Sequence, residues 1–123
     1  MPEPDRIHAA VRRYLDTVAT GTAAEIAALY HEDATLEDPA GSTPHTGRAA
    51  IEKFYSALES ARRSTELRSV RVSGNSAAFL FVVRTETADG TVTVEPIDVM
   101  TFDEDARITT MRAYWSAADI SAG

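Results

Sequence analysis

The period of the hydrophobic pattern changes once along the chain, near residue 60, and this change restricts the fold more than any other feature. Over residues 4–20, apolar side chains recur every three or four positions, as they do on the buried face of an amphipathic helix. Residues 22–31, which begin with the capping-box pair Thr22 and Glu25, and residues 47–60 have the same period. The first half of the chain is therefore predicted to contain three helices.

The second half has the pattern of β-strands. Its segments are rich in Val, Thr and aromatic residues and are separated by short turn sequences: "ELRSVRV", "SAAFLFVVRTETA", "TVTVEPIDVMTFD" and "RITTMRAYWS". Tight turns join neighbouring strands antiparallel, and a further short strand is expected at "DATLEDPAG". Helices that precede such a sheet can bury their apolar faces only against one of its faces. The prediction is therefore an α+β fold with a single domain over residues 1–123.

Composition excludes several classes of function. The formal net charge is −7, which disfavours nucleic acid and anionic membrane surfaces as partners, and the longest apolar run is too short to cross a bilayer. No cysteine is present, and none of His8, His31 and His45 has the spacing of a metal-binding pair. The N-terminus lacks the basic and then apolar order of a signal peptide. We expect a soluble, cytoplasmic protein that binds a small molecule and needs no metal or cofactor.

One acidic residue lies on the apolar face of a predicted strand. In "VEPIDVMTFDE", residues 94–104, strand alternation places Asp98 on the same face as Met100. A buried carboxylate that has no partner is energetically costly, so its charge must be compensated or absent. Asp98 is therefore paired with an arginine such as Arg84 or Arg112, is protonated, or lies in a cleft. Alternation alone does not choose between these interpretations.

Asp38 and three tyrosines are further candidates. Asp38 shares a strand face with Leu36, so it points toward the core or a cavity, unless it caps a backbone N–H in the turn "EDPAG". Tyr14, Tyr30 and Tyr55 lie on the apolar faces of the three predicted helices. Each can be an ordinary core residue. Three buried phenols against one sheet must nevertheless satisfy their hydroxyl groups, and bonding to one another is a simple way to do so.

Four segments, "RRYLDTV", "LYHEDATLEDPAG", "IEKFY" and "IDVMTFDEDARITTMRAYWS", resemble the Δ5-3-ketosteroid isomerases of the nuclear transport factor 2 superfamily in order and spacing, from about residue 7 to 118. The resemblance implies three helices on a strongly curved, mainly antiparallel sheet that forms a conical cavity. It implies an enzyme that moves the C5–C6 double bond of a 3-oxo-Δ5-steroid to the conjugated Δ4 position. It also implies a homodimer through the outer sheet face, which would cover Ile97 and Val99. Cyclases, epoxide hydrolases and non-catalytic lipid binders of the same superfamily are the alternatives.

The resemblance also implies roles for individual residues. Asp38 matches the general base that later acts as an acid, and Tyr14 matches an oxyanion donor. Asp98 matches a second oxyanion donor that stays protonated, and ketosteroid isomerases are themselves an established case of an aspartic acid kept neutral in an apolar site. Tyr55 and Tyr30 match tyrosines that support the donors through hydrogen bonds. The steroid pocket is expected to include Phe54, Phe81, Met100, Met111 and Trp115.

Overall fold

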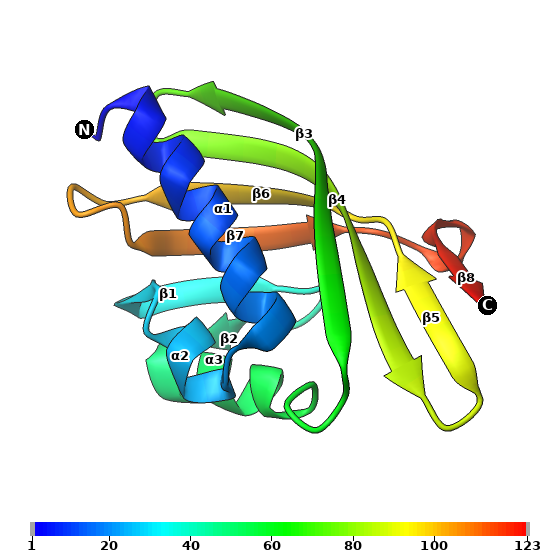
Figure 1. Ribbon diagram of the computed structural model, residues 1–123. Helices are drawn as coiled ribbons and strands as arrows, with labels where there is room; N and C mark the ends of the chain where they lie inside the picture. Colours follow the sequence, from blue (N-terminus) through cyan, green and yellow to red (C-terminus); the bar gives the residue numbers. More distant parts are fainter. Residues whose placement is uncertain (1, 123) are drawn as a thin grey trace.

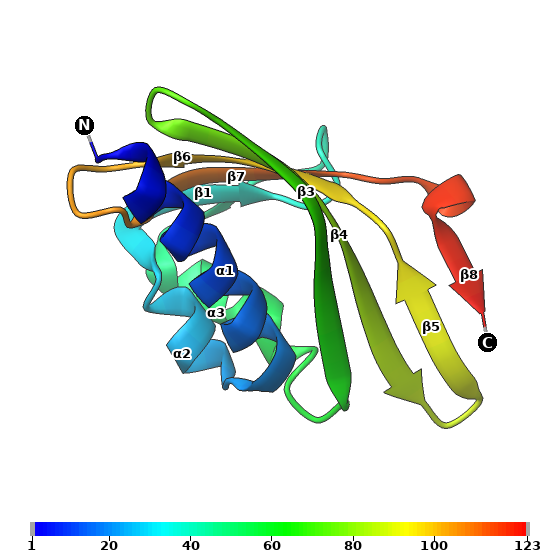
Figure 2. The ribbon, with the colours of Figure 1, turned by 45° about the horizontal axis from the view of Figure 1, so that its top comes forward.

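The computed structural model describes residues 2–122, and within them three α-helices lie against one face of a curved eight-stranded sheet (Figure 1). The helices are α1 (Pro4–Thr20), α2 (Ala23–Ala27) and α3 (Arg48–Ser56). The strands are β1 (Tyr30–Glu37), β2 (His45–Thr46), β3 (Arg63–Ser73), β4 (Ser76–Thr87), β5 (Gly90–Val94), β6 (Ile97–Phe102), β7 (Ile108–Tyr114) and β8 (Ile120–Ala122), and a short 3-10 helix, η1 (Ala117–Asp119), precedes β8. The predicted α+β class is confirmed. Figure 2 shows the helices below β1, β6 and β7, with β3, β4 and β5 curving down beside them.

Helix α1 has the predicted bounds. It begins at Pro4, whose missing N–H has no cost in the first turn. It ends where the N–H of Gly21 donates to the carbonyl of Thr17 at 2.7 Å. A Cβ atom at position 21 would lie 2.8 Å from that oxygen, so glycine permits the close approach. The buried face of the helix consists of Ile7, Val11, Tyr14, Leu15 and Val18.

Helix α2 has the predicted capping box but is shorter than expected. The N–H of Thr22 donates to Glu25 Oε1 at 2.8 Å, and the N–H of Glu25 donates to Thr22 Oγ1 at 3.1 Å. The expected helix over residues 22–31 is wrong beyond Ala27, because Tyr30 begins strand β1, which pairs in parallel with β7. Pairing with β7 buries Tyr30 in the core, so tertiary context overrides the local helical pattern.

Helix α3 ends at Ser56, four residues before the predicted end, and residues 57–61 form turns. In these turns the N–H of Leu58 donates to the carbonyl of Tyr55 at 2.9 Å, and the N–H of Ala61 donates to the carbonyl of Leu58 at 3.1 Å. The guanidinium of Arg63 binds the carbonyls of Leu58 and Ala61. Because the carbonyls of Leu58 and Ala61 accept hydrogen bonds from Arg63, they do not need partners in a further turn of the helix.

The predicted strand over "TVTVEPIDVMTFD" is broken into β5 and β6. Pro96 lies between them and has no N–H to donate to a neighbouring strand. Both parts pair antiparallel with the long strand β4: Phe79 is the partner of Asp98 in β6, and Val83 is the partner of Val94 in β5. The break lets β5 diverge from β6, so one side of the sheet opens where the helices do not cover it.

The remaining pairings make the sheet mixed but mainly antiparallel. Strand β7 pairs antiparallel with β6 and in parallel with β1, and only the second pairing departs from the expected antiparallel order. The short strands β2 and β8 were not predicted, because each has three residues or fewer. Within residues 2–122, no helix is long and apolar enough to cross a membrane.

Candidate active site

A cavity of about 320 Å³ opens between α1, α3 and the concave face of the sheet. This volume lies at the lower end of the range for sites that bind small organic ligands. Tyr14, Asp38 and Asp98 all line it, although they come from α1, the loop after β1, and β6. Most other lining residues are apolar, so the cavity suits an apolar ligand with few polar atoms. Three of the predicted pocket residues also line it, namely Phe54, Phe81 and Trp115.

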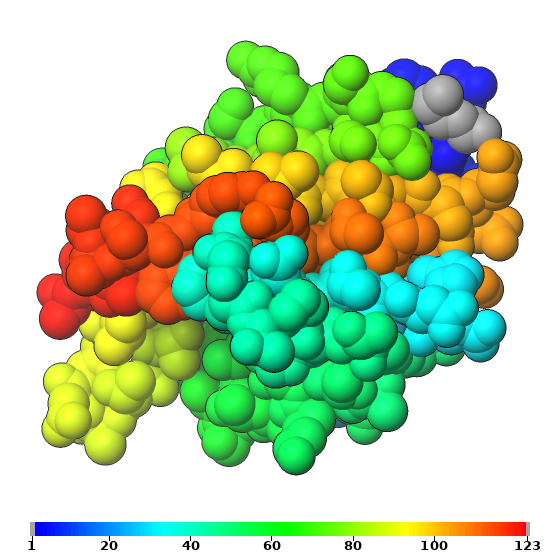
Figure 3. Space-filling model, turned by 180° about the vertical axis from the view of Figure 1, so that it is seen from behind, coloured from blue at the N-terminus to red at the C-terminus, as the bar shows by residue number. Residues whose placement is uncertain are grey.

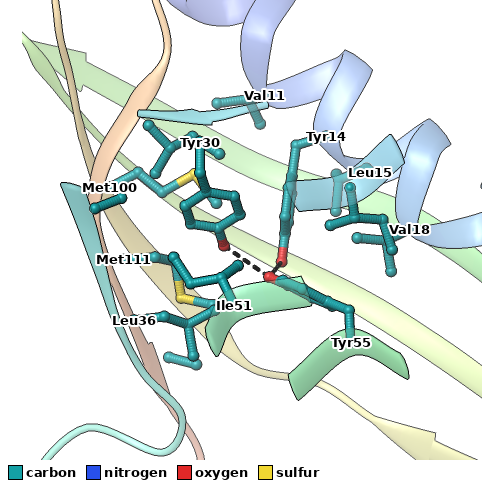
Figure 4. Close-up of a cluster of buried hydrophobic side chains, with 14 of the residues drawn as sticks. Val11, Tyr14, Leu15, Val18, Tyr30, Leu36, Ile51, Tyr55, Met100 and Met111 are labelled. Atoms are coloured by element: carbon teal, nitrogen blue, oxygen red, sulfur yellow. Dashed lines mark hydrogen bonds between the residues drawn. The ribbon is translucent and has the colours of Figure 1, made fainter. Parts of the chain in front are cut away.

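Two predicted pocket residues lie elsewhere. Met100 and Met111 are buried in the core and are not among the described residues that line the cavity. They are partners across β6 and β7, and Figure 4 shows both beside the ring of Tyr30. They share a strand face with the cavity residues Asp98 and Ala113, but they lie two positions farther along the strands. Their expected place in the steroid pocket stays a prediction.

The three tyrosine hydroxyl groups meet in the interior, as Figure 4 shows. The hydroxyl oxygens of Tyr14 and Tyr55 are 2.9 Å apart, and those of Tyr30 and Tyr55 are 2.7 Å apart. The expectation that these phenols satisfy one another is confirmed, with the correction that Tyr30 belongs to a strand. Burial raises the pKa of Tyr14 well above its usual value, and the nearby phenol of Tyr30 adds to this effect. The hydroxyl groups therefore stay protonated and can donate.

Asp98 has no hydrogen-bond partner within residues 2–122. Its side chain is 1% exposed, and neither carboxyl oxygen is bonded. Arg84 pairs with Glu66 at 3.5 Å, and Arg112 pairs with Glu37 at 3.1 Å. The interpretation in which either arginine neutralises Asp98 is therefore wrong.

The surroundings of Asp98 favour its protonated form. Burial raises the pKa of this carboxyl well above its usual value, and the charge of Asp38 raises it further. Both causes disfavour the ionised form. Asp98 lines the cavity, and in its protonated form it would have one O–H donor for a ligand atom placed there.

Asp38 is half-buried and accepts a hydrogen bond from Trp115, whose Nε1–H lies 2.6 Å from Oδ1. Burial raises the pKa of Asp38, while the Trp115 hydrogen bond and the nearby His45 oppose the rise. The alternative that Asp38 only caps its turn is not supported, because the turn amide of Gly41 donates to Glu37 Oε1 at 3.0 Å. Of the two carboxyl groups that line the cavity, that of Asp38 is more exposed to solvent than that of Asp98.

The contact between Trp115 and Asp38 was missed by sequence reasoning, which placed Trp115 only in the pocket wall. The two residues are 77 positions apart, and no spacing rule connects them. His45 was treated as an ordinary loop residue, yet its ring lies 5.0 Å from that of Phe54, which lines the cavity. Among the described residues, no three His, Asp or Glu side chains gather where they could hold a metal ion.

Comparisons with known proteins show the family of this chain. Residues 11–111 match the model of the SnoaL-like domain family. A protein from Nocardioides simplex named Steroid Delta-isomerase is 58% identical over 114 residues, which are 93% of each chain. The solved structure of SalBIII, described as an epoxide hydrolase/cyclase-like enzyme in pyran ring formation, matches with a TM-score of 0.92, 25% identity and complete coverage of both chains. The chain therefore belongs to the SnoaL-like family within the nuclear transport factor 2-like superfamily, and its relatives include the ketosteroid isomerases that its motifs indicated.

Proposed function

We propose that this protein is a steroid Δ-isomerase that converts 3-oxo-Δ5-steroids to their conjugated Δ4 isomers. The identity of 58% with a named steroid isomerase supports this reaction. The observation that carries the proposal is the pair of unbonded carboxyl oxygens on Asp98, which lies in the same apolar cavity as Tyr14 and Asp38. A ligand oxygen that accepts from Asp98 would satisfy a buried polar group that the described residues leave unsatisfied.

Asp38 is the proposed base. The reaction removes a proton from C4 of the steroid and returns a proton to C6, and one carboxylate above the ring plane can perform both steps. The hydrogen bond from Trp115 engages Oδ1, which leaves Oδ2 to take the proton. The raised pKa of Asp38 makes its ionised form a stronger base while the hydrogen bond limits the rise.

Tyr14 and Asp98 are the proposed donors to the dienolate oxygen. Removal of the C4 proton places negative charge on the 3-oxygen, and fixed donors in an apolar cavity stabilise such a charge strongly. The three tyrosines have three hydroxyl protons and share two hydrogen bonds. If donation runs from Tyr30 to Tyr55 to Tyr14, the proton of Tyr14 is free for the ligand. In this direction each donor also strengthens the next one.

The substrate would enter with its A ring first. Asp98 and the tyrosines are fully buried, whereas the opposite part of the cavity is lined by Val94 and the exposed Ile120. The 3-ketone therefore reaches the buried donors, and the D ring lies toward the opening beside Ile120. This arrangement predicts weak selection among substituents at C17.

A steroid assay tests the proposal directly. Purified protein is mixed with 5-androstene-3,17-dione, and the absorbance of the conjugated enone is followed. We expect a steady rise that falls by about 10²–10⁴-fold in Asp38→Asn, which lacks the base. The matched variant Asp33→Asn changes an exposed aspartate on β1 and should keep the rate. Absence of enone formation by the unaltered protein would refute the proposal.

An epoxide hydrolase or cyclase is the second candidate, because the fold matches that of SalBIII over both chains. A hydrolase of this type would use an arginine near its acids to orient water. No arginine is among the described residues that line the cavity. Arg84 and Arg112, which were considered as partners of Asp98, are instead in ion pairs on the surface. Turnover of an epoxide without turnover of the steroid would favour this candidate.

We also infer a homodimer through the outer sheet face. Ile97 and Tyr114 are partners across β6 and β7 and are 43% and 45% exposed. Figure 3 shows the two strands as neighbouring yellow-orange and orange-red bands on the surface seen from behind. Ile97 begins β6 and Tyr114 ends β7, and the exposure of this apolar pair is explained if a second copy of the chain covers it. Sedimentation should give a dimer, and Ile97→Asp should shift it toward monomer; a monomeric unaltered protein would contradict this inference.

A further inference from the structure

Arg63, the first residue of β3, is an internal cation that the proposed reaction does not use. Its side chain is 8% exposed. The guanidinium donates to the backbone carbonyls of Val18 at 2.7 Å, Gly21 at 3.1 Å and Ala61 at 3.2 Å, and also to that of Leu58. None of the ion pairs among residues 2–122 includes Arg63. Carbonyl dipoles therefore compensate its charge.

These carbonyls belong to the ends of two helices. Those of Val18 and Gly21 lie at the C-terminus of α1, and those of Leu58 and Ala61 lie in the turns after α3. Carbonyls at helix ends lack partners within the helix and carry partial negative charge. A guanidinium has five N–H donors in one rigid plane, so it can bind both groups of carbonyls at once. Arg63 thus links the end of α1 to the end of α3.

Each linked end carries a tyrosine of the candidate site. Val18 follows Tyr14 by one helical turn, and Leu58 follows Tyr55 by three residues. The side chains of all four residues line the cavity. Direct packing between α1 and α3 is sparse, since α3 packs mainly on α2, β1 and β2. The ends of α1 and α3 are therefore linked by the contacts of Arg63 together with α2, which follows α1 after two residues and packs on α3.

We propose that Arg63 is a positioning residue that sets the separation of α1 and α3 and so aligns the hydroxyl groups of Tyr14 and Tyr55. The hydrogen bond between these hydroxyls is 2.9 Å long, and such bonds weaken steeply with distance and angle. The catalytic consequence rests on the proposed isomerase function, whereas the alignment itself does not.

Replacement of Arg63 by lysine should cause a partial loss of activity. Arg63→Lys keeps the charge, but one ammonium group cannot bind the carbonyls of both helix ends in the same plane. A shift of the donors by about 1 Å can cost about 100-fold in rate, so we expect kcat to fall by roughly 10- to 100-fold with little change in KM. Arg62→Lys is the matched control, because the side chain of the neighbouring Arg62 is 85% exposed and forms a surface ion pair with Glu86.

Binding of 2-naphthol provides a readout that does not require turnover. Its phenolate places a negative oxygen on a planar apolar body, as the dienolate does. We expect Arg63→Lys to weaken binding of the phenolate by a factor similar to its loss in kcat, while Arg62→Lys leaves both unchanged. If the unaltered protein binds 2-naphthol but does not isomerise steroids, the alignment can still be tested, and only the proposed function fails.

A double-mutant cycle separates alignment from general stability. Tyr55→Phe removes the hydrogen bond through which Arg63 is proposed to act, so Arg63→Lys should change phenolate affinity by less than about threefold in that background. Thermal unfolding shows whether each variant is folded at the assay temperature. A second variant, Arg63→Met, removes every N–H donor of the side chain. If this variant does not fold, Arg63→Lys still tests the proposal. The proposal would be overturned if the losses in phenolate affinity from Arg63→Lys and Tyr55→Phe multiply in the double variant. It would also be overturned if Arg63→Lys lowers Tm but leaves phenolate affinity unchanged.

Discussion

Replacement of Asp98 by leucine should make the protein more stable and less active. Asp98 is buried, and its carboxyl oxygens have no partner within residues 2–122. A buried polar group without a partner costs about 1–3 kcal/mol. Leucine removes this cost, and the adjoining cavity has room for its larger side chain. We therefore expect the free energy of unfolding to rise by about 1–3 kcal/mol, even at a pH where Asp98 is protonated in both the folded and the unfolded state. This gain corresponds to a rise in Tm of about 4 °C per kcal/mol.

The gain should also depend on pH, because burial raises the pKa of Asp98 well above its usual value. The unfolded chain releases this proton near pH 3.9 while the folded protein keeps it, so the folded state binds more protons. Wild-type stability then falls as pH rises, by up to about 1.4 kcal/mol per pH unit from this group. The difference between Asp98→Leu and wild type should widen from about pH 4 upward. It should stop widening at the pKa of Asp98 in the folded protein.

Urea unfolding of both proteins at a series of pH values measures this difference. Asp98→Asn should lose the pH dependence without the full gain in stability, because its amide is still a buried polar group. Asp89→Asn, on the exposed turn between β4 and β5, controls for the change in net charge. In parallel, kcat of Asp98→Leu should fall by about 10²–10³-fold, as for the loss of one oxyanion donor. A variant that is less stable at every pH, or a difference that does not vary with pH, would show that Asp98 is not a neutral, unsatisfied acid.

Three further predictions follow from the contacts in and near the site. Trp115→Phe removes a donor that favours ionised Asp38, so the acid limb of the kcat/KM profile should move to higher pH; a shift to lower pH would contradict this role. Tyr14→Phe should lower kcat by about 10²–10³-fold, whereas Tyr30→Phe, which removes only the far end of the chain, should cost roughly tenfold or less; equal losses would argue against the proposed direction of donation. Gly21→Ala should lower stability by about 1–3 kcal/mol in thermal unfolding, because its Cβ would contact the last turn of α1, and a neutral effect would show that the turn adapts.

Local patterns predicted much of the fold. The three- and four-residue period located α1 with its bounds, and the capping box located the start of α2. Alternation placed Asp98 on the buried face of β6. The errors occur where distant pairing competes with local preference. Tyr30 lies in β1 because β7 is available as a partner, and β5 separates from β6 because Pro96 cannot donate to a neighbouring strand.

Within the candidate site, the residue types were predictable and their contacts were not. Resemblance to ketosteroid isomerases named Tyr14, Asp38 and Asp98, and all three line one cavity. It also named Met111, which is buried in the core and is not among the described residues that line the cavity. Whether an inward residue meets the cavity or the core depends on its distance along a curved strand. Alternation reports only the face of the strand.

The sequence by itself determined the order of the elements, the inward face of each and the absence of thiol chemistry, because these follow from composition and from neighbours two to four positions apart. The tertiary structure decided which groups surround Asp98, since only the sheet register directs Arg84 and Arg112 to surface acids and leaves this carboxyl without a hydrogen-bond partner among the described residues. It likewise decided that Trp115 reaches Asp38 across 77 positions. Such contacts depend on strand register and sheet curvature, which no local pattern encodes.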